Sequence, residues 1–120
     1  MKLDEIAKEL DLASLTPEAP ATETPEISAG YASDLLSDVL ANAPGGGVLV
    51  TTQVHMNVVA VAAHAGLTAV IFTSGRTPDS ATSERAAEEN VRLYSTLENT
   101  FDVVGRLYAM GLRGSQEQAA

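Results

Sequence analysis

The sequence predicts a three-layer α/β domain in which helices cover both faces of a mainly parallel sheet. Strand-like runs at residues 48–50, 69–72 and 92–94 are each followed by a polar loop and a helical segment. These cycles recur about every 22 to 24 residues, as in parallel βαβ units with right-handed crossovers. The run at 48–50 is apolar at every position, as expected of a strand that is buried on both faces.

The N-terminal segment predicts one helix followed by an exposed loop. Apolar residues recur at helical spacing with charged residues between them, which predicts a short amphipathic helix that ends before Asp11. The apolar positions are Leu3, Ile6, Ala7 and Leu10. Residues 16–26 hold three prolines, three glutamates and no large apolar side chain, so this stretch predicts an exposed loop.

The next segment predicts a short strand at residues 27–32 and then a helix. Ser33 or Asp34 is placed to cap that helix with a side-chain oxygen. The apolar residues of the helix are Leu35, Leu36, Val39 and Leu40. Its pattern stops at residues 42–44, and the three glycines at 45–47 are expected to form a flexible turn into the first buried strand.

Three more helices are expected after the buried strands. The first covers residues 57–64, and Gly66 is placed to end it. A charged helix is predicted over residues 79–90, and a last helix over residues 98–110. The inner face of the last helix is predicted to carry Phe101, Val104, Leu107 and Tyr108.

The composition indicates a single soluble domain and excludes several classes of function. With 120 residues, of which 45% are apolar, the chain suffices for one compact core. Its net charge of -9 disfavours nucleic acid and anionic membrane surfaces as partners. The absence of cysteine excludes disulfides and thiolate sites and fits a cytoplasmic location. The charged N-terminus and the lack of an apolar run of ~20 residues predict no signal peptide and no membrane span.

Candidate ligand-binding residues follow the predicted strands, at the edge of the sheet where α/β proteins usually bind ligands. The candidates are Thr52, Gln53, His55, Asn57, Ser74, Gly75, Arg76, Ser95 and Thr96. Gln53, His55 and Asn57 alternate, so an extended backbone would project them on one side toward a polar ligand. Alternatively, His55 or Asn57 caps the following helix and Gln53 ties down a neighbouring loop.

Arg76 is the candidate for anion binding, because it is a fixed positive charge beside several predicted helix N-termini. Gly75 would let the backbone approach a phosphate or carboxylate. The alternative is a surface salt bridge to Asp79 or to another acidic group. Ser95 and Thr96 fit a helix cap better than a nucleophile, since no base is assigned to either.

Catalysis or metal binding by His55 would need further groups that its surroundings in the sequence do not supply. Imidazole can transfer protons or bind a metal. Neither an HxxxH pattern nor a nearby carboxylate pair accompanies His55. We therefore expect no metal and no cofactor.

Three segments resemble the DRTGG domain family. They are residues 28–39, 53–62 and 105–108. Ser28-Ala29-Gly30 stands where the family has Thr-Gly-Gly. The resemblance covers residues 1–112 and implies a three-layer α/β domain similar to the N-terminal domain of HPr kinase, leaving residues 113–120 as a flexible polar tail. Such domains also occur inside phosphotransacetylases and CBS-containing pyrophosphatases, and the resemblance suggests dimerisation and regulation.

Free-standing members of this family are often labelled as serine kinases. The sequence does not support a kinase activity for this chain. The phosphate loop GxxxxGK[ST] needs a lysine to reach the phosphates. Here the only glycine run is followed by Val48-Leu49-Val50, without a lysine. The resemblance implies no catalytic role for the domain alone, so we expect a non-catalytic protein.

The leading interpretation is a non-enzymatic, homodimeric regulatory or interaction module that binds a small anionic ligand, such as a nucleotide, at the candidate edge. One alternative is an accessory protein that contacts a metabolic or redox enzyme. Another is a small hydrolase or transferase that uses His55.

Overall fold

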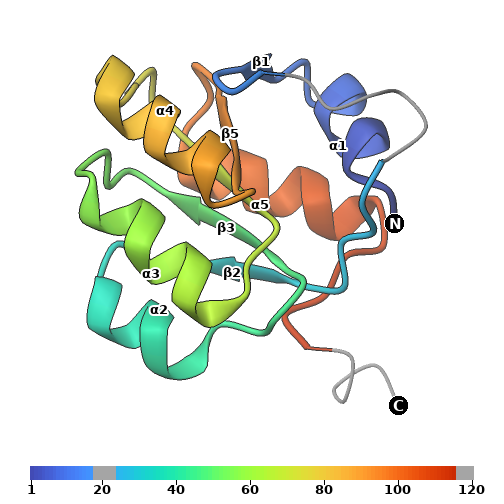
Figure 1. The fold of residues 1–120 in the computed structure, drawn as a ribbon. Helices are drawn as coiled ribbons and strands as arrows, with labels where there is room; N and C mark the ends of the chain where they lie inside the picture. The colour runs from blue at the N-terminus through green and yellow to red at the C-terminus, as the bar shows by residue number, and fades with distance from the viewer. Residues whose placement is uncertain (18–23, 116–120) are drawn as a thin grey trace.

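The fold consists of a five-stranded sheet between two layers of helices (Figure 1). A computed structural model describes residues 1–17 and 24–115. The elements are α1 (Leu3–Glu9), β1 (Ala13–Ser14), β2 (Gly30–Ala32), α2 (Leu36–Asn42), β3 (Val48–Thr51), α3 (Asn57–Ala65), β4 (Ala69–Phe72), α4 (Ser80–Glu88), β5 (Arg92–Ser95) and α5 (Thr100–Ala109). This arrangement confirms the predicted three-layer α/β fold class.

The strands lie in the order β1-β5-β4-β3-β2. Strands β2 to β5 are parallel, and Gly30, Val48, Ala69 and Arg92 lie in register across them. Strand β1 pairs antiparallel with β5 and was not expected from the sequence. It is only two residues long and both are exposed, so no apolar pattern marks it.

Two apolar cores fill the space on the two sides of the sheet. One joins α1 and α5 to the sheet face that carries Val48 and Ile71. The other joins α2, α3 and α4 to the opposite face, which carries Leu49 and Phe72. Figure 1 shows these two groups of helices on opposite sides of the strands. Because every residue of β3 and β4 is buried, the prediction of strands covered on both faces is confirmed.

The predicted side-chain cap of α2 is wrong. The N-cap position is Leu35, and no side chain caps the helix there. The Ser33 hydroxyl accepts the Leu35 N–H at 3.2 Å, one residue before the helix. Asp34 instead accepts hydrogen bonds from the end of β3, where the Thr51 hydroxyl lies 2.9 Å away. The Asp34 carboxylate, which the local sequence predicted as a cap of α2, therefore binds the end of β3 instead.

The predicted inner face of α5 is correct only for Leu107. The residues of α5 that are buried are Val103 and Leu107, whereas Phe101 is 86% and Tyr108 59% exposed. Val104 is also exposed. The helix carries apolar residues on two faces, and periodicity alone cannot tell which of them the sheet covers.

The predicted loop at residues 16–26 and the predicted tail at residues 113–120 fall partly outside the described residues, since neither 18–23 nor 116–120 is described. Glu26 pairs with the N-terminal amine at 2.9 Å. At the other end, the Arg113 carbonyl accepts the Gly30 N–H at 2.9 Å, so the chain is tied to the edge of the sheet up to this residue. None of the described helices is long and apolar enough to span a membrane.

The glycine segment before β3 is closely packed against residues 28–30. The Ser28 N–H and hydroxyl donate to the carbonyls of Gly46 and Gly45, at 3.0 and 2.9 Å. Gly46 has a φ of +78°, a conformation that favours glycine. A Cβ added at Gly47 would lie 2.8 Å from the Ala29 carbonyl oxygen, which is closer than real Cβ contacts allow.

Replacing Gly47 with alanine is expected to lower the free energy of unfolding by about 1–3 kcal/mol, because the new methyl group would overlap backbone that cannot move alone. Gly45→Ala is the matched control, since a Cβ there would lie 3.7 Å from its nearest neighbour, the Ala65 carbonyl oxygen. Chemical denaturation of both variants measures the difference. Equal loss of stability in the two would contradict the close packing at Gly47.

Candidate functional site

The candidate site lies where the parallel strands end. Strands β3, β4 and β5 run in the same direction, so their carboxyl ends lie at one edge of the sheet. Each is followed by a short loop and then by α3, α4 or α5. This edge therefore gathers three loops and the beginnings of three helices, and it is the edge at which open α/β sheets usually bind ligands.

The exit of β3 does not follow the extended path that was expected for Gln53, His55 and Asn57. The strand ends at Thr51, and Asn57 is the first residue of α3. The His55 Nδ1 accepts the Asn57 N–H at 3.1 Å, and the Gln53 N–H donates to the Thr51 hydroxyl at 3.1 Å. The imidazole thus binds the first turn of α3, as in the alternative that the sequence left open. Asn57 belongs to the helix and not to an extended segment.

The exit of β4 is a tight turn that is tied to the exit of β5. Ser74 and Gly75 both have positive φ, of 61° and 72°, and the Arg76 N–H donates to the Thr73 carbonyl at 3.2 Å. The N–H groups of Ser74 and Gly75 donate to the Glu98 and Thr96 carbonyls, at 2.7 and 2.9 Å. Because these N–H donors are already bonded, Gly75 allows the turn to form but does not supply an anion site. The Arg76 side chain follows the turn and is exposed.

One hollow brings together three of the predicted residues, and we call it the β3–β4 hollow. It has a volume of about 660 Å³ and lies between the loops that follow β3 and β4. The predicted residues that line it are Gln53, His55 and Arg76. Thr77, Asp79 and Thr82 line it from the side of α4.

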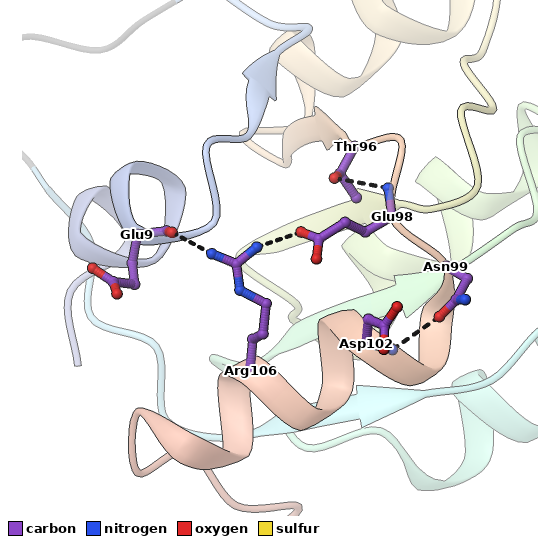
Figure 2. Close-up of polar contacts among 6 residues, drawn as sticks. All are labelled: Glu9, Thr96, Glu98, Asn99, Asp102 and Arg106. Atoms are coloured by element: carbon purple, nitrogen blue, oxygen red, sulfur yellow. Dashed lines mark hydrogen bonds and ion pairs between the residues drawn. The ribbon is translucent and has the colours of Figure 1, made fainter.

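A second hollow, of about 460 Å³, lies at the end of β5 and is called the β5 hollow. The predicted residues that line it are Gly75, Ser95 and Thr96. Figure 2 shows Arg106 reaching from α5 toward this region, where its guanidinium donates to the Glu98 carboxylate and, at 2.7 Å, to the Glu9 carbonyl. Six of the nine predicted residues are therefore divided between two hollows, and Thr52, Asn57 and Ser74 line neither of them. The arginine of the β5 hollow, Arg106, already has partners in its own chain.

The expected cap of the last helix by Ser95 or Thr96 is wrong. Asn99 caps α5, since its side-chain oxygen accepts the Asp102 N–H at 2.9 Å (Figure 2). The Thr96 hydroxyl accepts the Glu98 N–H at 3.2 Å and so holds the preceding loop. Asn99 was the better candidate in the sequence, because it stands one residue before the helix begins and asparagine is a favoured N-cap.

Two carboxylates at this edge were not predicted as site residues. The Thr52 N–H and the Thr51 hydroxyl donate to Asp34, and with the positive charge of Arg76 they lower the pKa of Asp34. The hydroxyl and N–H of Thr82, both 2.8 Å away, lower the pKa of Asp79, with a smaller contribution from His55. Asp79 could have been recognised as the residue just before a helix, but nothing in the local sequence connects Asp34 with β3.

The side chains at the candidate site are better placed to bind a ligand by hydrogen bonds and charge than to catalyse a reaction or hold a metal ion. Within the described part of the chain, the imidazole of His55 is bonded only to a backbone N–H, and no nucleophile is bonded to it. Among residues 1–17 and 24–115, no group of three or more acidic or imidazole side chains is placed to hold a metal ion. Arg76 makes no ion pair within these residues, and the salt bridge to Asp79 that the sequence allowed does not form there.

The fold is similar to that of a solved regulatory region of an enzyme. The solved structure contains the CBS and DRTGG domains of the regulatory region of Clostridium perfringens pyrophosphatase, complexed with its activator, diadenosine tetraphosphate. It aligns with a TM-score of 0.71 and 18% identity, over 92% of this chain and 47% of that one. The chain thus has a DRTGG-like α/β fold and spans about half the length of its structural neighbour.

The comparison with families and with curated proteins gives no match. No protein-family model matches the sequence, and no curated protein does. The fold that the resemblance implied is confirmed by structure, while membership of the DRTGG family stays a prediction.

Replacing Asp34 with asparagine is expected to destabilise the fold at neutral pH and to have a smaller effect in strong acid. The pKa of Asp34 in the folded chain lies below its ordinary value of 3.8. Its ionised form therefore stabilises the fold above that value, and this stabilisation is lost as the pH falls through the lowered folded pKa. The free energy of unfolding of both proteins, measured from neutral to acid pH, tests this. A difference that stays constant with pH would contradict it.

Proposed function

We propose that this domain is a non-catalytic regulatory module that binds a small anionic ligand in the β3–β4 hollow. The proposal depends on the exposure of Arg76 and on its lack of an ion pair within the described residues. The Arg76 guanidinium borders a hollow whose other polar side chains include Gln53 and His55. A planar guanidinium offers two parallel donors to a phosphate or carboxylate, and few other side chains bind these groups as strongly.

The size and polarity of the β3–β4 hollow suit a small organic ligand. Its volume of about 660 Å³ falls within the range of roughly 300–1,000 Å³ that is usual for ligand pockets. The backbone donors of the β4 turn are occupied, so the ligand would be held by side chains instead of a backbone anion nest. Gln53 supplies donors and an acceptor, and His55 keeps its second ring nitrogen for the ligand.

The carboxylates around the hollow limit the charge of the ligand. Asp79 lines the hollow itself, and Asp34 lies close enough to Arg76 for the two charges to interact. Both are stabilised in their ionised forms by hydrogen bonds. A ligand with several adjacent negative charges would be repelled by them. The hollow therefore favours one phosphate or carboxylate group joined to a hydrogen-bonding body, as in a nucleoside monophosphate.

The proposal of a regulatory role is based on the solved structure that has a similar fold. The matched structure is a regulatory region in complex with a nucleotide activator. A nucleotide response is the corresponding proposal for this chain, which lacks the lysine-bearing phosphate loop GxxxxGK[ST]. The domain acts as a homodimer in this proposal, because symmetric dimers are the commonest way in which small subunits associate.

Ligand binding is tested by thermal unfolding against a panel of nucleotides, acyl phosphates and small carboxylates. A ligand that prefers the native state must raise the unfolding midpoint. Arg76→Ala is expected to remove that rise, since a hydrogen bond to a charged group contributes about 1.5–3 kcal/mol, which is tenfold or more in affinity.

Arg85→Ala is the matched control, because Arg85 is also exposed but pairs with Glu89 on α4 at 3.3 Å. It should leave the ligand response unchanged. A flat panel, or a shift that survives Arg76→Ala, would reject the β3–β4 hollow as the binding site. Turnover that His55→Ala abolishes would instead establish an enzyme.

A further inference from the structure

Helix α5 carries a second apolar face that residues 1–17 and 24–115 leave uncovered. Phe101, Val104, Gly105 and Tyr108 are spaced by three and four residues and lie on one side of the helix, and we call them the α5 stripe. The two aromatic side chains are 86% and 59% exposed, while Val103 and Leu107 on another side of the helix fill the core. A helix that buries one apolar face and exposes another is suited to contact a further surface.

Gly105 lies in the middle of this stripe and has open space in front of it. A Cβ added at Gly105 would find no atom of the described residues within 4 Å. Glycine in an exposed helix costs about 1 kcal/mol relative to alanine, and no contact among these residues accounts for that cost. A missing side chain on an exposed apolar face allows the backbone of another helix to approach closely.

An apolar hollow adjoins the C-terminal end of the stripe. It has a volume of about 130 Å³ and is lined by Val104 and Tyr108 of α5, by Tyr31 of β2 and by Leu112. An apolar cavity of ~150 Å³ in another protein holds a benzene molecule, so this hollow is close to the size of a phenyl ring. The chain's own Phe101 is seven residues from Tyr108, about 10.5 Å along the helix, and points to solvent.

We propose that a second copy of the chain docks on the α5 stripe, with its α5 antiparallel to the first. A two-fold axis between positions 104 and 105 would place Val104 of each copy over Gly105 of the other. The same axis places Phe101 opposite Tyr108, so each phenyl ring meets the apolar hollow of the partner. Each contact then occurs twice, as an isologous interface requires.

The charges at the ends of the stripe also fit a second copy. Asp102 is exposed beside Phe101. The Arg113 guanidinium stacks on the Tyr108 ring, 3.6 Å from its centroid. Pairing Phe101 with Tyr108 therefore brings the carboxylate of one copy toward the guanidinium of the other, at both ends. A chain with a net charge of -9 would otherwise repel its own copy.

The exposed aromatic side chains of the stripe supply a substantial part of a small interface. An aromatic side chain can bury about 150–250 Å². With exposed fractions of 86% and 59%, the two rings would together provide roughly a third of the ~800 Å² that each partner contributes to a standard interface. Val104 and the lining of the apolar hollow add to this area from both copies.

This inference rests on the homodimer of the proposed function and is independent of the β3–β4 hollow. Cysteine cross-linking tests the register in which the two α5 helices pair. The natural chain contains no cysteine, so each variant carries one thiol. Position 104 lies beside the two-fold axis, so the cysteines of Val104→Cys in the two copies are expected to form a disulfide, with their Cα atoms within the ~7 Å limit. Ala109→Cys is the matched control, because the two copies of position 109 would lie about 13.5 Å apart along the helices. Equal cross-linking of the two variants would overturn the proposed register.

Light-scattering mass of the full chain tests the interface itself. Phe101→Asp and Gly105→Gln are expected to halve the mass of the wild-type dimer, and Gly105→Gln should do so without loss of folding because glutamine favours helix. Leu40→Asp, at an exposed apolar residue of α2, should leave the mass unchanged.

The outcomes separate this inference from the proposed function. A wild-type mass of one chain would overturn the homodimer and leave the stripe to a different protein. A dimer that survives both α5 substitutions would overturn only the choice of α5. Ligand stabilisation that depends on Arg76 would remain valid in either case.

Discussion

The burial of β3 and β4 on both faces is the constraint on which the rest of the structure depends. Every residue of these two strands is buried between the core with α1 and α5 and the core with α2, α3 and α4. Both cores need helices, and the connections between parallel strands supply three of them. Because the strands are parallel, this arrangement brings the loops after β3, β4 and β5 to one edge, where the candidate site is found.

Hydrogen bonding within that edge decides which groups remain for a ligand. The N–H groups of Ser74 and Gly75 bind the loop after β5, and the Thr52 N–H binds Asp34. Buried or half-buried backbone donors seldom stay unpaired, so the loops stabilise each other at the expense of a backbone anion site. In the proposed function, recognition of a ligand then depends on side chains, chiefly Arg76 and His55, and the ionised Asp34 and Asp79 would limit the negative charge of that ligand.

Helix α5 has one apolar face that is buried and another that is exposed. Val103 and Leu107 fill the core beneath the sheet, while Phe101 and Tyr108 remain exposed. A domain of this size buries a limited fraction of its apolar surface when it folds. Contact with a second copy through the outer face would extend the burial without changing the packing against the sheet.

The sequence by itself determined the order of the elements other than β1, the two fully buried strands and the loops that hold the candidate residues, because apolar runs, glycines and prolines act locally. Only the tertiary structure decided which face of α5 is buried, since both faces are apolar. It also decided the role of Asp34, whose partner Thr51 is 17 residues away, and the pairing of β1 with β5, which no local pattern marks. The division of the candidate residues between two hollows likewise depends on contacts between loops that are distant in the sequence. Such contacts form only when the strands are side by side.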